Sequence, residues 1–264
     1  MDDADNREPT RDVPVTLAST VPAGFELPID LLEFTGPEPK PIWLNEAGGV
    51  TVRFDAAGSS ASADGTRLRY LKRNPLPSSE DLALEAEKLE WLTARHPVPR
   101  VIDYVRRSDA EFLITEAIPG ANAVAAENTA RANTAIAAIG EGLRRLHDLP
   151  VDDCPWTWSV ADRLRAATTE RASTLSPTPE IDRLVVCHGD PCAPNTLLDA
   201  AGRFVGHVDM QRLGVADRWA DLAVATMSFG WNYDAFDEAV FWDAYGIAPD
   251  EKRIRYYREL WDAE

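Results

Sequence analysis

The hydrophobic periodicity of this chain of 264 residues changes from strand-like to helical near residues 115–121. Before the change, the alternation typical of strands occurs in four short segments: 49–54, 68–72, 101–105 and 111–115. After it, apolar residues recur every three or four positions, as between Ala132 and Leu146. This division predicts an α+β fold of two lobes with a cleft between them. We expect a β-rich lobe over residues 1–116, of which 1–40 are partly loose, and a mainly helical lobe over 117–264.

The charge of the chain narrows the classes of partner. It has 27 Lys and Arg residues against 44 Asp and Glu residues, which gives a formal net charge of −17. Such acidity disfavours nucleic acids and anionic membrane surfaces and favours a cationic partner.

The three cysteines, Cys154, Cys187 and Cys192, form no C-x-x-C pair and predict neither a disulfide framework nor a zinc site. No segment resembles a signal peptide or a membrane span, so we expect a cytoplasmic protein.

One glutamate of the first lobe occupies a position that requires a cationic partner. The segment Ser78-Ser79-Glu80-Asp81 has the composition of a capping box, and apolar residues at helical spacing follow from Leu82 to Leu92. Glu85 lies three residues after Leu82 and four before Leu89, and therefore on or beside the buried face of this helix. Because an unpaired buried carboxylate is costly, we expect a cation beside Glu85.

A predicted hairpin in the second lobe brings two potential metal ligands together. Segments 196–199 and 204–208 are typical of short strands, with Asn195 directly before them and Asp209 directly after. Because a hairpin returns the chain to its starting point, Asn195 and Asp209 should lie side by side, with Asp190 one loop away. An amide oxygen and a carboxylate make a site of hard oxygen ligands suited to Mg²⁺, which leaves Asp190 as a proton acceptor.

The spacing His-x-Asp-x-x-x-x-Asn, followed by a second metal-binding Asp, is the one that protein kinases use for phosphoryl transfer. Its His-Gly-Asp form resembles the small-molecule kinases of the aminoglycoside phosphotransferase family, especially the aminoglycoside 3'-phosphotransferase branch. The resemblance extends over residues 42–264 and rests on six segments: 188–199 (HGDPCAPNTLLD), 206–223 (GHVDMQRLGVADRWADLA), 143–150 (LRRLHDLP), 153–155 (DCP), 245–247 (YGI) and 256–257 (YY). It implies a protein-kinase-like fold with a nucleotide-binding N-terminal lobe and a catalytic, acceptor-binding C-terminal lobe.

The resemblance also implies a role for each residue that matches the family motifs. Asp190 is expected to orient the acceptor hydroxyl and take its proton. Asn195 and Asp209 are expected to hold the Mg²⁺ ions that bridge the nucleotide phosphates. Lys72 matches the lysine that contacts the α- and β-phosphates, and Glu85 matches the helix glutamate that pairs with it. Lys72 is thus the cation that the helical spacing requires.

Further residues are implied to bind the nucleotide or to support the catalytic loop. Backbone groups at Thr115 and Ala117, in the connection between the lobes, are expected to bind the adenine edge. Gly48 and Gly49 stand where the family has its phosphate-covering loop, and glycine allows close approach of the backbone to phosphate. Asp221 resembles the aspartate that braces the catalytic loop.

Three other residues near these motifs are interpreted as structural. A structural role is favoured for His188 over ligation or base catalysis, and the same interpretation is preferred for His207, which lies on a strand beside Asp209. No base is positioned by the sequence to activate Cys192, so a buried and inert thiol is expected there.

The acceptor site is where the chain departs from the family pattern. Arg212 matches a family residue near the acceptor. Asp262 and Glu264 stand in the C-terminal segment, which in the family supplies an acid that contacts the substrate. The segment 156–186 is shorter than in the family and carries three arginines, which make a wall less suited to cations: Arg163, Arg165 and Arg171.

Together these residues predict a Mg²⁺-dependent phosphotransferase that uses ATP or GTP as donor. The favoured acceptor is the 3'-hydroxyl of a cationic aminoglycoside, with antibiotic resistance as the result, and the enzyme is expected to be a monomer or a dimer. One alternative is a kinase of another small hydroxylated metabolite or antibiotic. A second alternative is a nucleotide-binding protein without efficient catalysis.

Overall fold

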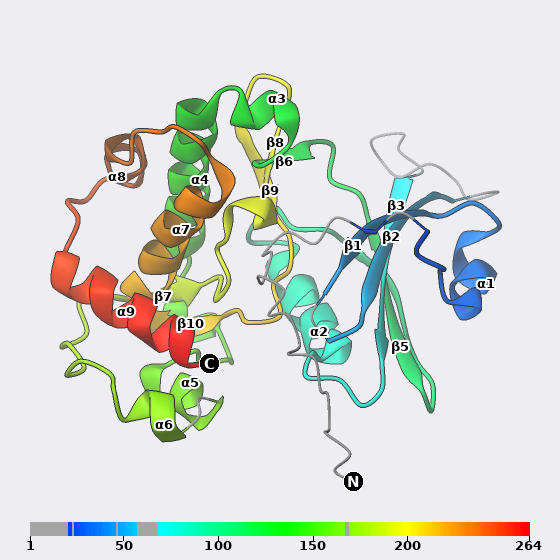
Figure 1. Cartoon of the computed structure of the whole chain (residues 1–264), viewed down its shortest axis with the longest axis horizontal. Coiled ribbons are helices and arrows are strands. Elements are labelled where there is room, and N and C mark those ends of the chain that lie inside the picture. Colours follow the sequence, from blue (N-terminus) through cyan, green and yellow to red (C-terminus); the bar gives the residue numbers. More distant parts are fainter. Residues whose placement is uncertain (1–20, 23, 46, 57–67, 167–168) are drawn as a thin grey trace, which may run out of the picture.

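A computed structural model describes residues 21–264 except 23, 46, 57–67 and 167–168, so the first half of the segment 1–40, expected to be partly loose, lies outside the described part. Figure 1 shows a sheet on one side of the molecule and most helices on the other, which confirms the predicted α+β class. The first half contains these elements: η1 (Ile29–Leu31), α1 (Leu32–Thr35), β1 (Lys40–Leu44), β2 (Val50–Asp55), β3 (Leu68–Pro75), α2 (Leu82–Leu92), β4 (Val101–Arg106) and β5 (Ala110–Glu116). Within residues 1–40, which were expected to be partly loose, the segment 29–35 is helical.

The first five strands form one antiparallel sheet in the order β1-β2-β3-β5-β4. Alternation along β3 turns Leu71 to one face, where it joins an apolar cluster with Leu31 that lies beneath α1. The next residue, Lys72, faces the opposite side, on which α2 packs against Leu113 of β5. The central position of β3 therefore directs the lysine toward the helix that carries Glu85.

The second half is mainly helical and has two small sheets. Its elements are β6 (Ala121–Asn122), α3 (Ala126–Thr129), α4 (Ala132–His147), η2 (Val151–Asp153), α5 (Val160–Ala166), α6 (Thr169–Ala172), β7 (Leu184–Cys187), η3 (Ala193–Asn195), β8 (Thr196–Leu198), β9 (Phe204–His207), β10 (Gly214–Asp217), α7 (Trp219–Asn232), α8 (Ala239–Tyr245) and α9 (Glu251–Ala263). Strand β10 pairs with β7, and β6, β8 and β9 form a three-stranded sheet. These short strands hold the loops that carry the predicted catalytic residues.

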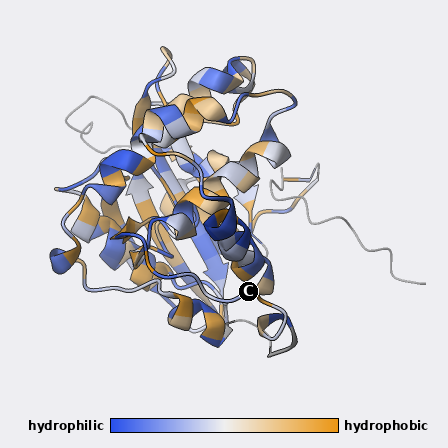
Figure 2. Cartoon of the chain, turned by 90° about the vertical axis from the view of Figure 1, so that its left-hand side faces the viewer, coloured by the Kyte–Doolittle hydropathy of each residue, from blue (hydrophilic) through white to orange (hydrophobic). Residues whose placement is uncertain are grey.

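The core of this half forms between α4, α7, α8 and α9. Helix α7 is buried along most of its length, including Leu222 and Phe229, and it packs against α9. Figure 2 shows α9, which ends at the label C, as largely hydrophilic from the outside, whereas its inner side buries Tyr256 and Leu260. This amphipathic helix brings the C-terminal residue Glu264 against α5, which carries Arg163.

A buried seam joins the two halves. Leu82 and Leu89 of α2 belong to the same apolar cluster as Leu146, Met210 and Leu213 of the second half. The α2 residue Lys88 also donates a hydrogen bond across the seam to the backbone oxygen of Gln211. Strand β5, the last strand of the five-stranded sheet in chain order, ends at Glu116.

The start of α2 differs from the predicted capping box. Its N-cap is Asp81, whose side chain accepts a hydrogen bond from Leu84 N at 2.9 Å, so the helix begins at Leu82. Ser78 instead accepts from the backbone N–H of Glu80 at 3.1 Å, ahead of the helix. This frees the Glu80 carboxylate for contacts outside the helix.

None of the helices in the described part of the chain combines the length and the hydrophobicity that a membrane span requires.

Candidate active site

The hairpin of β8 and β9 brings Asn195 and the chain before Asp209 together. Thr196 lies opposite His207 in the hairpin, and Val208 N donates to Asn195 O at 3.0 Å. The Asn195 side chain turns back to the catalytic loop, where its Nδ2 donates to Asp190 O at 2.9 Å. This leaves the Asn195 amide oxygen for a ligand. Asp209 follows directly, with a positive φ of 63° that turns the chain sharply after the hairpin.

Lys72 forms ion pairs with two acids from different parts of the chain. Its Nζ donates to Glu85 Oε1 at 2.8 Å and to Asp209 Oδ1 at 3.0 Å. Burial alone would lower the pKa of Lys72, but the charges of Asp209 and Glu85 outweigh it and raise that pKa well above its usual range. Burial opposes ionisation of Asp209, yet the Lys72 ammonium holds the pKa of Asp209 below its usual range. The site therefore contains a fixed ammonium and an ionised carboxylate at neutral pH.

Asp190 has a carboxylate oxygen with no competing partner. Its Oδ1 is buried and accepts no hydrogen bond from any described residue. Its backbone N–H donates to His188 Nδ1 at 3.2 Å, and His188 Nε2 contacts Val208 O at 3.0 Å. Nδ1 therefore accepts and Nε2 donates, and these two hydrogen bonds let the ring support the loop, which agrees with the structural interpretation. Asp190 is left free to accept a proton from a hydroxyl.

Asp221 binds the backbone of the catalytic loop. Its Oδ2 accepts from His188 N at 2.6 Å and its Oδ1 accepts from Gly189 N at 2.9 Å. His147 Nε2 lies 3.0 Å from Oδ2, and the other ring nitrogen of His147 lies 2.8 Å from the Tyr245 hydroxyl oxygen. Burial would raise the pKa of Asp221, but the hydrogen bonds with His147 and Gly189 N and the nearby histidines together outweigh it and lower that pKa. This carboxylate fixes the loop immediately before Asp190.

The loop between β1 and β2 carries Gly48 and Gly49 and is anchored by an asparagine. Asn45 Oδ1 accepts from Gly49 N, and Asn45 Nδ2 donates to Glu80 Oε2 at 2.6 Å. Asn74 Nδ2 donates to the same Glu80 oxygen at 3.2 Å. Burial and the nearby Asp209 charge raise the pKa of Glu80. Gly48 has a φ of 79°, which favours glycine there.

Asn45, Asn74 and Glu80 were not predicted as part of the site. Their contacts join residues 29 and 35 positions apart, across a loop, a strand and a helix start. Glu80 was visible in the sequence only as a member of the capping box. In the structure its carboxylate instead binds Asn45, which anchors the glycine loop, and it is near enough to Asp209 for that charge to raise its pKa.

The two positions expected to bind adenine lie at the end of the sheet. Thr115 is mostly buried and stands opposite Tyr70 of β3. Ala117 N donates to Leu68 O at 3.1 Å, so this N–H is engaged by the first residue of β3. Binding of a nucleotide through Ala117 N would require that hydrogen bond to open.

The acceptor residues are only partly brought together. Glu264 lies between two guanidinium groups, because Arg163 Nε donates to its Oε1 and Arg212 Nη1 lies 3.5 Å from its Oε2. Asp262 has an exposed side chain, and its backbone oxygen accepts from Arg171 Nη1 at 2.9 Å. Arg165 pairs with Asp162 on its own helix. Arg212 and Glu264 therefore meet, whereas Asp262 points to solvent.

His207 behind the loop is consistent with its structural interpretation, and Cys192 within the loop is partly exposed where a buried thiol was expected. His207 Nδ1 lies 2.9 Å from His96 Nε2, and burial lowers the pKa of both rings. Burial and the Asp190 charge raise the pKa of the Cys192 thiol well above its usual range, so the thiolate that nucleophilic chemistry needs is disfavoured.

Comparisons with known proteins agree with this geometry. Residues 58–180 and 160–257 match the profile of the phosphotransferase enzyme family (APH). The chain belongs to this family. The streptomycin 3''-kinase of Streptomyces griseus is 34% identical over 83% of this chain and 90% of its own length. An aminoglycoside 3'-phosphotransferase of Streptomyces fradiae is 37% identical over 82% of this chain and 92% of its own length.

Solved structures support the same assignment. A crystal structure of an aminoglycoside-3'-phosphotransferase of type VIII has a TM-score of 0.72 at 26% identity, covering 89% of this phosphotransferase and 97% of that chain. The structure of APH(3'')-Id from Streptomyces rimosus in complex with ADP and streptomycin has a TM-score of 0.62 at 29% identity. The match covers 82% of this chain and 92% of that chain. These relationships confirm the protein-kinase-like fold.

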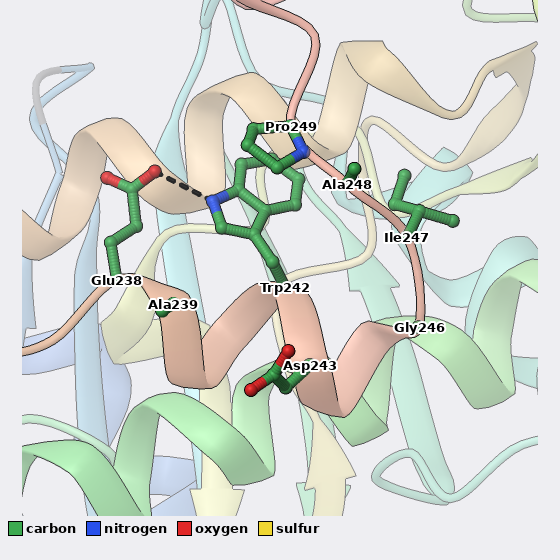
Figure 3. A pocket seen from close by; sticks show the side chains of 8 residues that line it. All are labelled: Glu238, Ala239, Trp242, Asp243, Gly246, Ile247, Ala248 and Pro249. Atoms are coloured by element: carbon green, nitrogen blue, oxygen red, sulfur yellow. Dashed lines mark hydrogen bonds between the residues drawn. The ribbon is translucent and has the colours of Figure 1, made fainter.

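A hollow of about 670 Å³ elsewhere on this phosphotransferase is distinct from the site. It lies along α8 and the residues that follow it, and Trp242 Nε1 donates to Glu238 Oε1 there at 2.9 Å (Figure 3). Figure 1 places α8 on the outer side of the helical half, away from the five-stranded sheet whose strand β3 carries Lys72. The chemistry described above is therefore not located in this hollow.

Proposed function

We propose that this phosphotransferase transfers the γ-phosphate of ATP or GTP to the 3'-hydroxyl of an aminoglycoside and so confers antibiotic resistance. The observation that carries the proposal is the Lys72 ammonium between Glu85 and Asp209, at 2.8 Å and 3.0 Å, beside a loop that presents Asp190. Relatives named for aminoglycoside phosphorylation at 30–37% identity support the acceptor class. We place nucleotide binding in residues 1–116, and catalysis and acceptor binding in 117–264, of a cytoplasmic enzyme.

The residues present fit a magnesium site. Asn195 uses its Nδ2 on Asp190 O and so presents an oxygen, and Asp209 has a second carboxylate oxygen besides the one that Lys72 binds. Amide and carboxylate oxygens are ligands that Mg²⁺ prefers. Bound there, Mg²⁺ would neutralise charge on the nucleotide phosphates.

The chain's own side chains then perform three tasks. Lys72, fixed by Glu85, is placed to contact the α- and β-phosphates. Asp190 Oδ1, which has no hydrogen-bond partner among the described residues, accepts the hydrogen bond of the acceptor hydroxyl and takes its proton. Asp221 and His188 keep Asp190 in this position through the backbone of the loop. Direct transfer requires no phosphorylated enzyme intermediate.

The test is ADP release by the full chain with Mg²⁺, ATP or GTP, and kanamycin or neomycin as acceptor. We expect acceptor-dependent ADP release, and a phosphate on the 3' oxygen of the product by NMR. The Asp190→Asn variant should lower kcat by about 10²- to 10⁴-fold while it retains nucleotide binding. Release of ADP that is unaffected by Asp190→Asn would contradict the mechanism. Turnover of an amino alcohol but of no aminoglycoside would favour a kinase of another small hydroxylated molecule.

A second position of transfer has a specific observation in its favour. The streptomycin 3''-kinase relative is 34% identical, close to the 37% of the 3'-phosphotransferase relative. Streptomycin therefore belongs in the same assay. Phosphorylation of streptomycin without phosphorylation of kanamycin would assign the 3''-hydroxyl in place of the 3'-hydroxyl.

A further inference from the structure

Arg163 on α5 has a fully buried guanidinium group that is paired through only one of its three nitrogens among the described residues. Its side chain is 1% exposed, and its Nε donates to Glu264 Oε1. Neither Nη1 nor Nη2 has a hydrogen-bond partner among the described residues. A buried cation without a counter-ion is strongly destabilising, so the pair with Glu264 is the interaction that permits this arginine.

This ion pair lies beside the catalytic loop. The backbone and Cβ of Arg212 pack directly on Gly189, the residue before Asp190. The Arg212 guanidinium lies 5.0 Å from the ring centre of Trp261 and 3.5 Å from Glu264 Oε2. The Glu264 carboxylate therefore lies near the catalytic loop, and its two oxygens face one arginine each. We call the group formed by Arg163, Arg212, Trp158 and Glu264 the acceptor wall.

Three buried hydrogen-bond donors at this wall have no acceptor among the described residues: Trp158 Nε1 and the Nη1 and Nη2 groups of Arg163. The Trp158 ring lies 5.8 Å from Arg163 Cζ and 5.7 Å from Arg212 Cζ. Trp158 Nε1 is buried and has no acceptor among the described residues. Guanidinium and indole N–H groups only donate, so a group that binds here must bring oxygen atoms that accept. An ammonium group would instead meet two positive charges balanced by one carboxylate.

We infer that Arg163 determines acceptor specificity by holding Glu264 away from substrate ammonium groups, so that this wall recognises an uncharged oxygen such as a hydroxyl. The inference rests on the proposed function and deepens it. It also separates the three arginines of the segment. Arg165 is neutralised at the surface by Asp162, and Arg171 donates to the backbone of Asp262, so Arg163 is the one that binds the Glu264 carboxylate.

The test uses two acceptors that differ beside the 3'-hydroxyl. Kanamycin A carries a hydroxyl on the neighbouring carbon and kanamycin B carries an amine. The measurement is kcat/KM for each, in the wild type and in Arg163→Met, Glu264→Gln, the double variant and Arg165→Met. Arg165→Met is the matched control, because it removes an arginine of the same helix that does not contact Glu264.

In Arg163→Met the released carboxylate can bind an amine. We expect the ratio of kcat/KM for kanamycin B to that for kanamycin A to rise about tenfold, which corresponds to one charge-assisted hydrogen bond. Glu264→Gln should change both kcat/KM values by the same factor, and the double variant should lose the gain. Arg165→Met should leave the ratio as in the wild type.

The outcomes separate the inference from the proposed function. Transfer to both kanamycins with a ratio that Arg163→Met does not change overturns the inference alone. No transfer by the wild type overturns the 3'-hydroxyl assignment and the inference with it. If circular dichroism shows that Arg163→Met does not fold, Glu264→Gln provides the test. A tenfold loss of kcat/KM confined to kanamycin B would show that Glu264 binds the amine and would overturn the inference.

Discussion

Acidification from pH 7 to pH 5 should destabilise the phosphotransferase through the histidine pair behind its catalytic loop. His96 and His207 are 4% and 1% exposed, and their ring nitrogens lie 2.9 Å apart. Burial, together with the nearby His188 and Arg145, lowers the pKa of His96 to about 3. Burial and the neighbouring His96 lower the pKa of His207 well below its usual range. Both rings are neutral in the folded chain at pH 5.

The sign and size of the effect follow from the unfolded state. An unfolded histidine binds a proton as the pH falls through about 6.5, whereas folded His96 does so only near pH 3. At pH 5 the unfolded chain therefore binds more protons, and the free energy of unfolding falls. For His96 alone the loss between pH 7 and pH 5 is about 2 kcal/mol, of which about 0.7 kcal/mol is lost by pH 6. His207 acts in the same direction.

Urea unfolding at pH 7, 6 and 5, followed by tryptophan fluorescence, measures this loss. His96→Asn is the matched variant, because asparagine keeps a hydrogen-bonding group toward His207 and does not titrate in this range. The variant should lose about 2 kcal/mol less than the wild type between pH 7 and pH 5. The acids of the chain titrate in both proteins and cancel in the difference. Equal losses in the two proteins would refute the reasoning.

Three further changes test the catalytic machinery. Lys72→Met should lower the free energy of unfolding by about 3 kcal/mol, because Glu85 would be buried without its partner. The double variant Lys72→Met with Glu85→Met should recover most of this lost stability, as measured by urea unfolding. Asp221→Asn should lower kcat by about 10²-fold with little change in the KM for nucleotide, since it loosens the loop that positions Asp190; a change confined to KM would contradict this role. Dialysis against EDTA should abolish transfer and added Mg²⁺ should restore it, and activity that persists without metal would exclude the proposed site.

The parts of the site that local spacing controls could be predicted from the sequence. Glu85 was placed on the buried face of its helix by its distance from Leu82 and Leu89, and the requirement for a cation followed from burial alone. The structure supplies that cation as Lys72, at 2.8 Å. The hairpin likewise follows from short-range chain geometry, which is why Asn195 and the residue before Asp209 are hydrogen-bond partners.

The parts that depend on contacts between distant side chains could not be predicted in the same way. Glu80 lies in the segment 78–81 that was predicted as a capping box, and a residue of such a box keeps its side chain at the helix start. In the folded chain it accepts hydrogen bonds from Asn45 and Asn74, which requires three elements to be in place first. A local rule favours Asp81 over Glu80 as the N-cap, because aspartate and not glutamate is preferred there, but it does not say what the Glu80 carboxylate will contact.

The acceptor wall shows the same limit for function. Counting charges treats Arg163, Arg165 and Arg171 alike, because all three lie in one short segment. The fold distinguishes them, since Arg163 reaches Glu264 across 101 residues while Arg165 pairs three residues away on its own helix. An acid at a substrate-binding position can bind an amine only if no cation of the protein already occupies it. The substrate preference of this phosphotransferase is therefore determined by the partner of Glu264 as much as by the presence of Glu264 itself.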